Sequence, residues 1–338
     1  MFLYKNLIIL LNFLRDLIKQ AINKNYINKN SSYFLMRIFY RITNGFLTNL
    51  ISYIISGYKY KNSNKFKKGF MQLKSFESNE VDTLKSQICQ MRVFDKRKID
   101  YRNNKSWVDE TENYAKSFKE LSNEDVVRLD VLKSELLSNR TVANFILDER
   151  WVKIVKKILG VEPRLIDVNC WYTLPHKNEF DIKKYDAQIW HKDVDKLRDI
   201  KIFLYLSDVD DLNYGPLEII IDTHRSNYSK IKYENNNNFR ISNNIIECNT
   251  EYKKYSFIGK RGTNFVVDTR CFHRGGIVEK GYRHIIELYF SNSVFGKHEY
   301  YNNFTRPKLN RLWGSYDIWA DAIKENPNTY FSLFLGKD

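Results

Sequence analysis

Two histidines, one aspartate and one arginine stand at spacings that could assemble a metal centre. His191 and Asp193 form a His-x-Asp pair at the end of the run 188–193, and His273 and Arg283 follow much later in the chain. Residues i and i+2 of a β-strand point to the same face, so His191 and Asp193 could occupy two neighbouring positions of one metal ion. A second histidine from a distant strand would complete a 2-His-1-carboxylate facial triad. That triad suits non-haem Fe(II) and leaves positions open for other ligands.

Strands that could position these residues are expected after Pro163, where the sequence pattern changes. Short runs rich in β-branched and aromatic residues are separated there by turn residues such as Gly215 and Pro216. Many short strands with turns between them predict a β-sandwich or jelly roll. The expected strands are 164–174, 187–193, 200–207, 217–221, 264–268 and 282–291.

Helices are expected before Pro163. Residues 78–92, 121–138 and 148–159 carry apolar residues at helical spacing, and Ser122 to Asp125 resembles a helix-capping pattern. The predicted fold class is therefore α+β, with helices packed against a jelly-roll, cupin-like core.

Positive charge is concentrated in residues 1–74. This segment contains thirteen Lys or Arg and one acid, Asp16, so it carries +12 of the total net charge of +15. The rest of the chain is nearly neutral, which argues against a nucleic-acid partner. Residues 2–22 and 33–58 are apolar enough to form amphipathic helices. Two interpretations stay open for them: packing on the following domain, which we favour, or contact with an anionic membrane surface through residues 1–70.

Cysteine usage indicates the cellular compartment. The four cysteines show neither a Cys-x-x-Cys pair nor a zinc-ligand spacing. Isolated thiols fit a reducing environment, so the expected location is the cytoplasm, with or without peripheral attachment to a membrane.

The order of several motifs resembles the phytanoyl-CoA dioxygenase family of Fe(II)/2-oxoglutarate oxygenases. The likeness covers roughly residues 76–295 and is strongest over 187–292, where the motifs agree in order and in mutual spacing. The motifs that carry the resemblance are Trp190–Asp193, Gly215–Arg225, Asp268–Gly276 and Arg283.

The resemblance implies a double-stranded β-helix and specific roles for the matching residues. His191, Asp193 and His273 would bind Fe(II), and Arg283 would pair with the far carboxylate of the cosubstrate 2-oxoglutarate. An arginine suits that task because its planar fork meets a carboxylate with two parallel hydrogen bonds. The implied reaction uses O₂ to hydroxylate a small or lipid-linked organic substrate, with release of succinate and CO₂. His224 is assigned no catalytic role.

Two departures from the family pattern fall in turns. The usual Pro-Gly-Ser-His is replaced by Ile-Asp-Thr-His at 221–224, and the common Gly-Asp is replaced by Gly262-Thr263. Neither departure touches a ligand position, so we expect changes in loop geometry and not in iron binding.

The chain is expected to divide into three parts. A basic helical segment (1–74) precedes an oxygenase domain (75–295), and an aromatic-rich tail (296–338) follows. Within the domain, residues 163–293 would form the jelly-roll core. The Asn- and Ser-rich insertion 223–254 would act as a lid.

Two other functions stay open at this point. The chain could be a cupin-like metal-binding protein that does not turn over 2-oxoglutarate, or a membrane-associated, non-catalytic relic of the fold. The presence of all four residues of the expected site argues against the relic.

Overall fold

The protein is described here by a computed structural model. It describes residues 66, 68–98, 107–159, 164–175, 186–193, 199–224, 240–248 and 251–291. The predicted helices at 2–22 and 33–58 and the C-terminal tail lie outside these residues. Among the residues that are described, no helix has both the length and the apolar character needed to cross a membrane.

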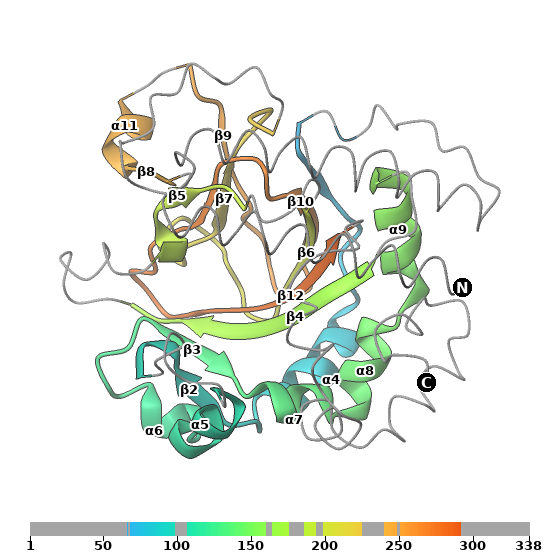
Figure 1. Ribbon diagram of the computed structural model, residues 1–338, viewed down its shortest axis with the longest axis vertical. Helices are drawn as coiled ribbons and strands as arrows, with labels where there is room; N and C mark the ends of the chain where they lie inside the picture. The colour runs from blue at the N-terminus through green and yellow to red at the C-terminus, as the bar shows by residue number, and fades with distance from the viewer. Residues whose placement is uncertain are drawn as a thin grey trace, which may run out of the picture.

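Two antiparallel β-sheets face each other and form the body of the domain (Figure 1). The larger sheet contains, in spatial order, β1 (Phe70–Gln72), β10 (Asn264–Asp268), β6 (Asp199–Tyr205), β12 (Arg283–Ser291), β4 (Arg164–Thr173), β3 (Arg128–Val131) and β2 (Val93–Asp95). The smaller sheet contains β8 (Arg240–Ile241), β5 (Trp190–His191), β11 (His273–Gly275), β7 (Leu217–Ile220) and β9 (Lys254–Ser256).

The chain passes repeatedly between the two sheets from β4 onward. Strands β4, β6, β10 and β12 belong to the larger sheet, and β5, β7, β9 and β11 belong to the smaller one. This exchange of strands between two facing antiparallel sheets is the arrangement of a jelly roll. The two facing antiparallel sheets agree with the predicted β-sandwich or jelly roll, and each strand expected after Pro163 is present, several of them shorter than expected.

Each strand of the larger sheet presents different side chains to its two faces, because successive residues alternate sides. On β12, Ile286, Leu288 and Phe290 belong to a large apolar cluster on the outer face. Ile285, of opposite parity, belongs to the cluster between the sheets. The charged residue Glu287 shares that inward parity, which places a carboxylate in the interior.

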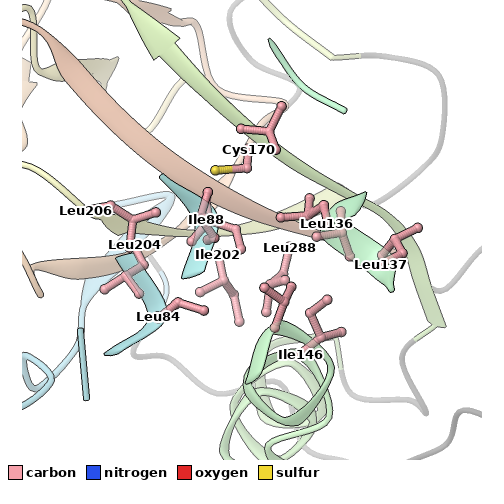
Figure 2. Packing of buried hydrophobic residues seen from close by; sticks show 14 of the residues in the cluster. Leu84, Ile88, Leu136, Leu137, Ile146, Cys170, Ile202, Leu204, Leu206 and Leu288 are labelled. Atoms are coloured by element: carbon pink, nitrogen blue, oxygen red, sulfur yellow. The ribbon is translucent and has the colours of Figure 1, made fainter. Parts of the chain in front are cut away.

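Helices cover the outer face of the larger sheet (Figure 1). The helices are α4 (Ser78–Ile88), α5 (Trp107–Tyr114), α6 (Phe118–Leu121), α7 (Lys133–Leu137), α8 (Arg140–Ile146), α9 (Glu149–Leu159) and, beside the smaller sheet, α11 (Asn243–Glu247); single 3-10 turns are η3 (Lys96–Lys98) and η4 (Asp186–Gln188). Figure 2 shows Ile88 of α4 and Ile146 of α8 meeting Ile202, Leu204 and Leu288 of the sheet. This aliphatic layer fixes the strands whose other face lines the interior.

Two helix predictions are confirmed, and a third is wrong. Helices α4 and α9 fall within the predicted ranges 78–92 and 148–159. The range 121–138 is not one helix, because strand β3 pairs there with both β2 and β4. The run Val126–Val131 is rich in β-branched residues, and pairing with the sheet overrides its helical spacing. The capping box lies earlier, at Ser117 and Glu120.

Part of the predicted insertion is an integral part of the smaller sheet. Strand β8 pairs with β5, so that Arg240 lies opposite His191, and helix α11 follows. Residues 225–239 lie outside the described part of the chain.

Candidate metal centre

His191 and His273 are brought together by strand pairing. They are direct partners of the antiparallel pair β5 and β11 in the smaller sheet. Their ring centroids lie 4.3 Å apart, with the ring planes inclined by 49°. Two side chains more than eighty residues apart in sequence thus present their imidazoles to one point between the sheets.

Each imidazole is held by a carbonyl of its own strand. His191 Nδ1 lies 2.8 Å from the carbonyl oxygen of Ile189, and His273 Nδ1 lies 3.0 Å from that of Cys271. A carbonyl oxygen can only accept, so the proton must sit on Nδ1 in both rings. The lone pair of each Nε2 is then available to a metal ion.

Asp193 supplies the carboxylate of the predicted triad. Its Oδ1 lies 4.0 Å from Nε2 of His191, and its Oδ2 lies 3.7 Å from Nε2 of His273. One ligand atom from each of the three residues lies within 4.8 Å of the other two. Among the described residues, these three form a group of the size and composition that could hold a metal ion.

Asp193 does not lie on the same strand as His191, contrary to the sequence prediction. Strand β5 ends at His191, and Asp193 follows it in an irregular stretch. Its backbone N–H donates to the carbonyl of Thr269, 2.9 Å away. This hydrogen bond joins Asp193 to the segment before β11, just beyond the end of β5. It holds the carboxylate beside the two rings.

Burial favours the neutral form of both imidazoles. Burial, followed by the neighbouring His273, lowers the pKa of His191 to about 3. Burial is also the main cause that lowers the pKa of His273. A neutral imidazole needs no deprotonation before it binds a metal ion.

Asp193 is ionised in spite of its enclosure. Burial by itself would raise the pKa of this carboxyl group, but Lys201, then His273 and His191, outweigh it and hold the pKa well below its usual range. The donor set is therefore two neutral imidazoles and one carboxylate, which fits Fe(II) and leaves further coordination positions to other ligands.

Lys201 and Glu287 are neighbours of the centre that the sequence analysis did not assign. Lys201 Nζ lies 3.0 Å from Asp193 Oδ2 and 3.3 Å from Glu287 Oε2. Both residues are charged positions within otherwise apolar runs, at 200–206 and 285–290. A single charged residue at an inward-facing position of an otherwise apolar strand was the feature of the sequence that could have revealed each of them.

Arg283 begins β12 and points into the interior beside β11. Its Nη1 donates to the carbonyl of Gly215, and its Nη2 donates to the hydroxyl of Thr173 at 3.2 Å. Both partners are uncharged, and within the described part of the chain Nε has no hydrogen-bond partner. Burial lowers the pKa of Arg283 to about 10, so the group remains a buried cation at neutral pH.

Gly275 leaves the space that the guanidinium fills. A Cβ built at this glycine would lie 2.6 Å from Nη2 of Arg283. Gly275 stands two residues after His273 on β11, which corresponds to a separation of roughly 6–7 Å along the strand. The guanidinium therefore lies beside the part of β11 that directly follows His273.

The turn after β7, where we expected altered loop geometry, has an unusual backbone conformation. Asp222 adopts a φ of 64°, in the left-handed region that glycine prefers. A non-glycine residue in this region carries local backbone strain.

Comparison with known proteins gives matches in structure only. No protein-family model and no curated protein matches this sequence. Solved structures with similar folds include HygX from Streptomyces hygroscopicus with nickel, 2-oxoglutarate and hygromycin B (13% identity, 68% of this chain and 85% of that chain, TM-score 0.44). They also include EctD from S. alaskensis with bound Fe (17% identity, 69% and 79%, TM-score 0.44) and the non-heme alpha ketoglutarate dependent carbocyclase SnoK from nogalamycin biosynthesis (12%, 66% and 80%, TM-score 0.45). Identities and TM-scores this low leave the assignment of the site to its own geometry.

Proposed function

We propose that the chain is an Fe(II)- and 2-oxoglutarate-dependent dioxygenase similar to the phytanoyl-CoA dioxygenase family. The observation that carries the proposal is the convergence of two Nδ1-anchored imidazoles and one ionised carboxylate on one point. The buried cation Arg283, with only uncharged hydrogen-bond partners among the described residues, supports the same proposal.

The residues of the chain would bind, orient and enclose the reactants. His191, Asp193 and His273 would hold the metal. Arg283 would hold the far carboxylate of 2-oxoglutarate by charge-assisted hydrogen bonds. When bound, the metal and cosubstrate supply oxygen activation, so that a substrate R–H, O₂ and 2-oxoglutarate give R–OH, succinate and CO₂. The position of the three residues, with His273 buried and His191 and Asp193 partly buried, would limit the access of water to the reacting atoms.

The substrate class is a small or lipid-linked organic molecule in this proposal. Its recognition would involve the insertion 223–254, whose strand β8 pairs with β5 beside His191. Attachment of residues 1–70 to a membrane surface stays a prediction that concerns residues outside the described part of the chain.

An anaerobic titration tests the proposed function. Metal-free protein is treated with Fe(II) and then with 2-oxoglutarate, and the visible metal-to-ligand charge-transfer band is recorded. We expect a band that requires both additions. A protein that binds Fe(II) without developing the band would support the alternative, a cupin-like metal protein. A protein that binds no Fe(II) would overturn the metal centre.

Arg283→Ala separates cosubstrate binding from metal binding. Loss of a buried, charged partner should weaken the apparent affinity for 2-oxoglutarate by roughly 10- to 100-fold while Fe(II) binding is retained. His224→Ala is the matched control, because this partly buried histidine contacts the thiol of Cys271 at 3.3 Å and has no role in the proposed site. An unchanged affinity in Arg283→Ala would remove this arginine from the site.

A further inference from the structure

Lys201 occupies an unusual position between two carboxylates. It shares its inward parity on β6 with Phe203 and Tyr205, which pack between the sheets. Its ammonium group lies 3.0 Å from Asp193 and 3.3 Å from Glu287. The lysine therefore links the predicted metal ligand to a second acidic side chain that the proposed mechanism does not use.

Glu287 is oriented toward this lysine by a hydrogen bond on its other oxygen. Asn169 Nδ2 donates to Glu287 Oε1 at 3.0 Å, which leaves Oε2 facing Lys201. The glutamate is 5% exposed, and it stands on β12 beside β6. It is a buried carboxylate with a fixed direction.

Glu287 is a buried carboxylate separated from Asp193 by a single ammonium group. Carboxylate oxygens are favoured ligands of hard divalent cations, and both acidic groups lie within 3.3 Å of the same nitrogen. Glu287 nevertheless is not a member of the three-residue metal group found among the described residues. What lies between Glu287 and Asp193 is the Lys201 ammonium group.

We propose that Lys201 is a positioning residue that keeps Glu287 from becoming a fourth protein ligand. By holding both carboxylates, it preserves a centre with three protein ligands and open positions for cosubstrate and oxygen. This role rests on the proposed function, because it requires a divalent metal held by His191, Asp193 and His273.

A different role for Lys201 makes a different prediction. If the ammonium bound 2-oxoglutarate or substrate directly, its removal would weaken binding whether or not Glu287 was present. If its role is to restrain Glu287, removal of the glutamate's charge should cancel the effect of removing the lysine. The double variant Lys201→Met/Glu287→Gln therefore distinguishes the two roles.

The test uses Mn(II) alone as the first probe. The relaxation of water protons by bound Mn(II) reports how many water molecules the metal retains. We expect Lys201→Met to bind Mn(II) but to show a lower relaxation rate per bound ion, because Glu287 replaces water. We expect Lys201→Met/Glu287→Gln to return to the wild-type value. Lys192→Met is the matched control, since Lys192 lies between two ligands in sequence but donates to the carbonyl of Thr223.

Cosubstrate binding is the second readout. Lys201→Met should bind 2-oxoglutarate at least about tenfold more weakly than the wild type, and the double variant should recover most of that loss. An unchanged relaxation rate in Lys201→Met, or a double variant that fails to recover, would overturn the proposal. Lys201→Met leaves Asp193 and the buried Glu287 without their shared cation, so this variant could fail to fold. The double variant, which removes the charges of Lys201 and Glu287 together, then decides alone: binding of Mn(II) and 2-oxoglutarate near wild-type levels supports the restraining role, and loss of 2-oxoglutarate binding refutes it.

The two proposals can fail separately in this experiment. A wild-type protein that binds no Mn(II) overturns both of them. A wild-type protein that binds Mn(II) but not 2-oxoglutarate contradicts the proposed dioxygenase function. The relaxation rates of the variants then still test the proposed role of Lys201.

Discussion

The two faces of the larger sheet differ in chemistry although they belong to the same strands. On β12, Ile286 and Leu288 enter the aliphatic layer beneath the helices, whereas Arg283 and Glu287 point between the sheets. The outer face gains stability from apolar burial, and the inner face holds charges that contribute little to stability unless they are paired. Stability and chemistry are therefore separable in this molecule, residue by residue along one strand.

The largest effect is expected from the inner face. His273→Ala, His191→Ala or Asp193→Ala should abolish metal-dependent turnover coupled to 2-oxoglutarate, because each removes one of the three proposed ligands. The folded structure should persist, since the aliphatic layer is untouched. Succinate formation measures the coupled turnover, and thermal unfolding followed by circular dichroism shows whether the variant is folded. A variant that retained full coupled turnover would refute the triad.

A substitution on the outer face should have the opposite result, a loss of stability without a loss of metal binding. Leu288→Ala removes a side chain that is 1% exposed and should lower the free energy of unfolding by about 2–5 kcal/mol. Urea denaturation measures this loss. Affinity for Mn(II) at low temperature, where the variant is folded, should equal that of the wild type. A large loss of metal affinity with little loss of stability would contradict the separation of the two faces.

His284 sharpens the comparison, because it is a titratable group on the outer face. It stacks on Tyr172 at 3.8 Å, and its Nε2 lies 3.3 Å from Cys170 Sγ. Burial lowers the pKa of His284 to about 3, below its ordinary value of 6.5. Between these two pKa values the unfolded chain binds a proton at His284 and the folded chain does not. The free energy of unfolding is therefore unaffected by the titration of this group above pH 6.5 and decreases as the pH falls toward 3.

Replacement of His284 by phenylalanine should reduce this pH dependence. A single group contributes a slope of at most about 1.4 kcal/mol per pH unit in that window. Between pH 7 and pH 4, the free energy of unfolding of the wild type should fall more than that of His284→Phe. Parallel curves would show that His284 is not the group that titrates.

The smallest effect is expected at the turn after β7. Asp222 adopts a φ of 64°, a conformation that glycine accepts readily and β-branched residues do not. Asp222→Val should be less stable than Asp222→Gly by about 1–2 kcal/mol. Thermal melts of the pair measure the difference, and the metal affinity of both variants should match that of the wild type. Equal stability would indicate that the turn relaxes.

Local sequence patterns predicted six of the strands after Pro163, because alternation and turn residues depend on nearest neighbours. The His-x-Asp spacing and the later His273 predicted three residues that the fold brings together, and their role as metal ligands stays a prediction. The pattern did not place Asp193 beyond the end of β5, because strand ends are set by pairing with other segments. The helical spacing of 121–138 was misleading for the same reason, since β3 exists only through its partners β2 and β4.

The surroundings of the triad could not be predicted from the sequence. Lys201 and Glu287 lie 86 positions apart in the chain, and their contact follows from the register of β6 with β12. Asn169 joins them through the pairing of β4 with β12. Register is a property of the whole sheet, so such contacts become visible only when the strands are assembled.

The anchoring of both imidazoles by main-chain carbonyls has a consequence for mutational tolerance. Because Ile189 and Cys271 use their backbone oxygens, replacement of either side chain leaves the acceptor in place. Substitution of either of these two side chains should therefore not change which ring nitrogen of the neighbouring histidine carries the proton. Asp193 depends on the side chain of Lys201 and has no such protection. Side chains around the two histidines can therefore be substituted without changing their tautomers, whereas Asp193 and Lys201 would have to be substituted together.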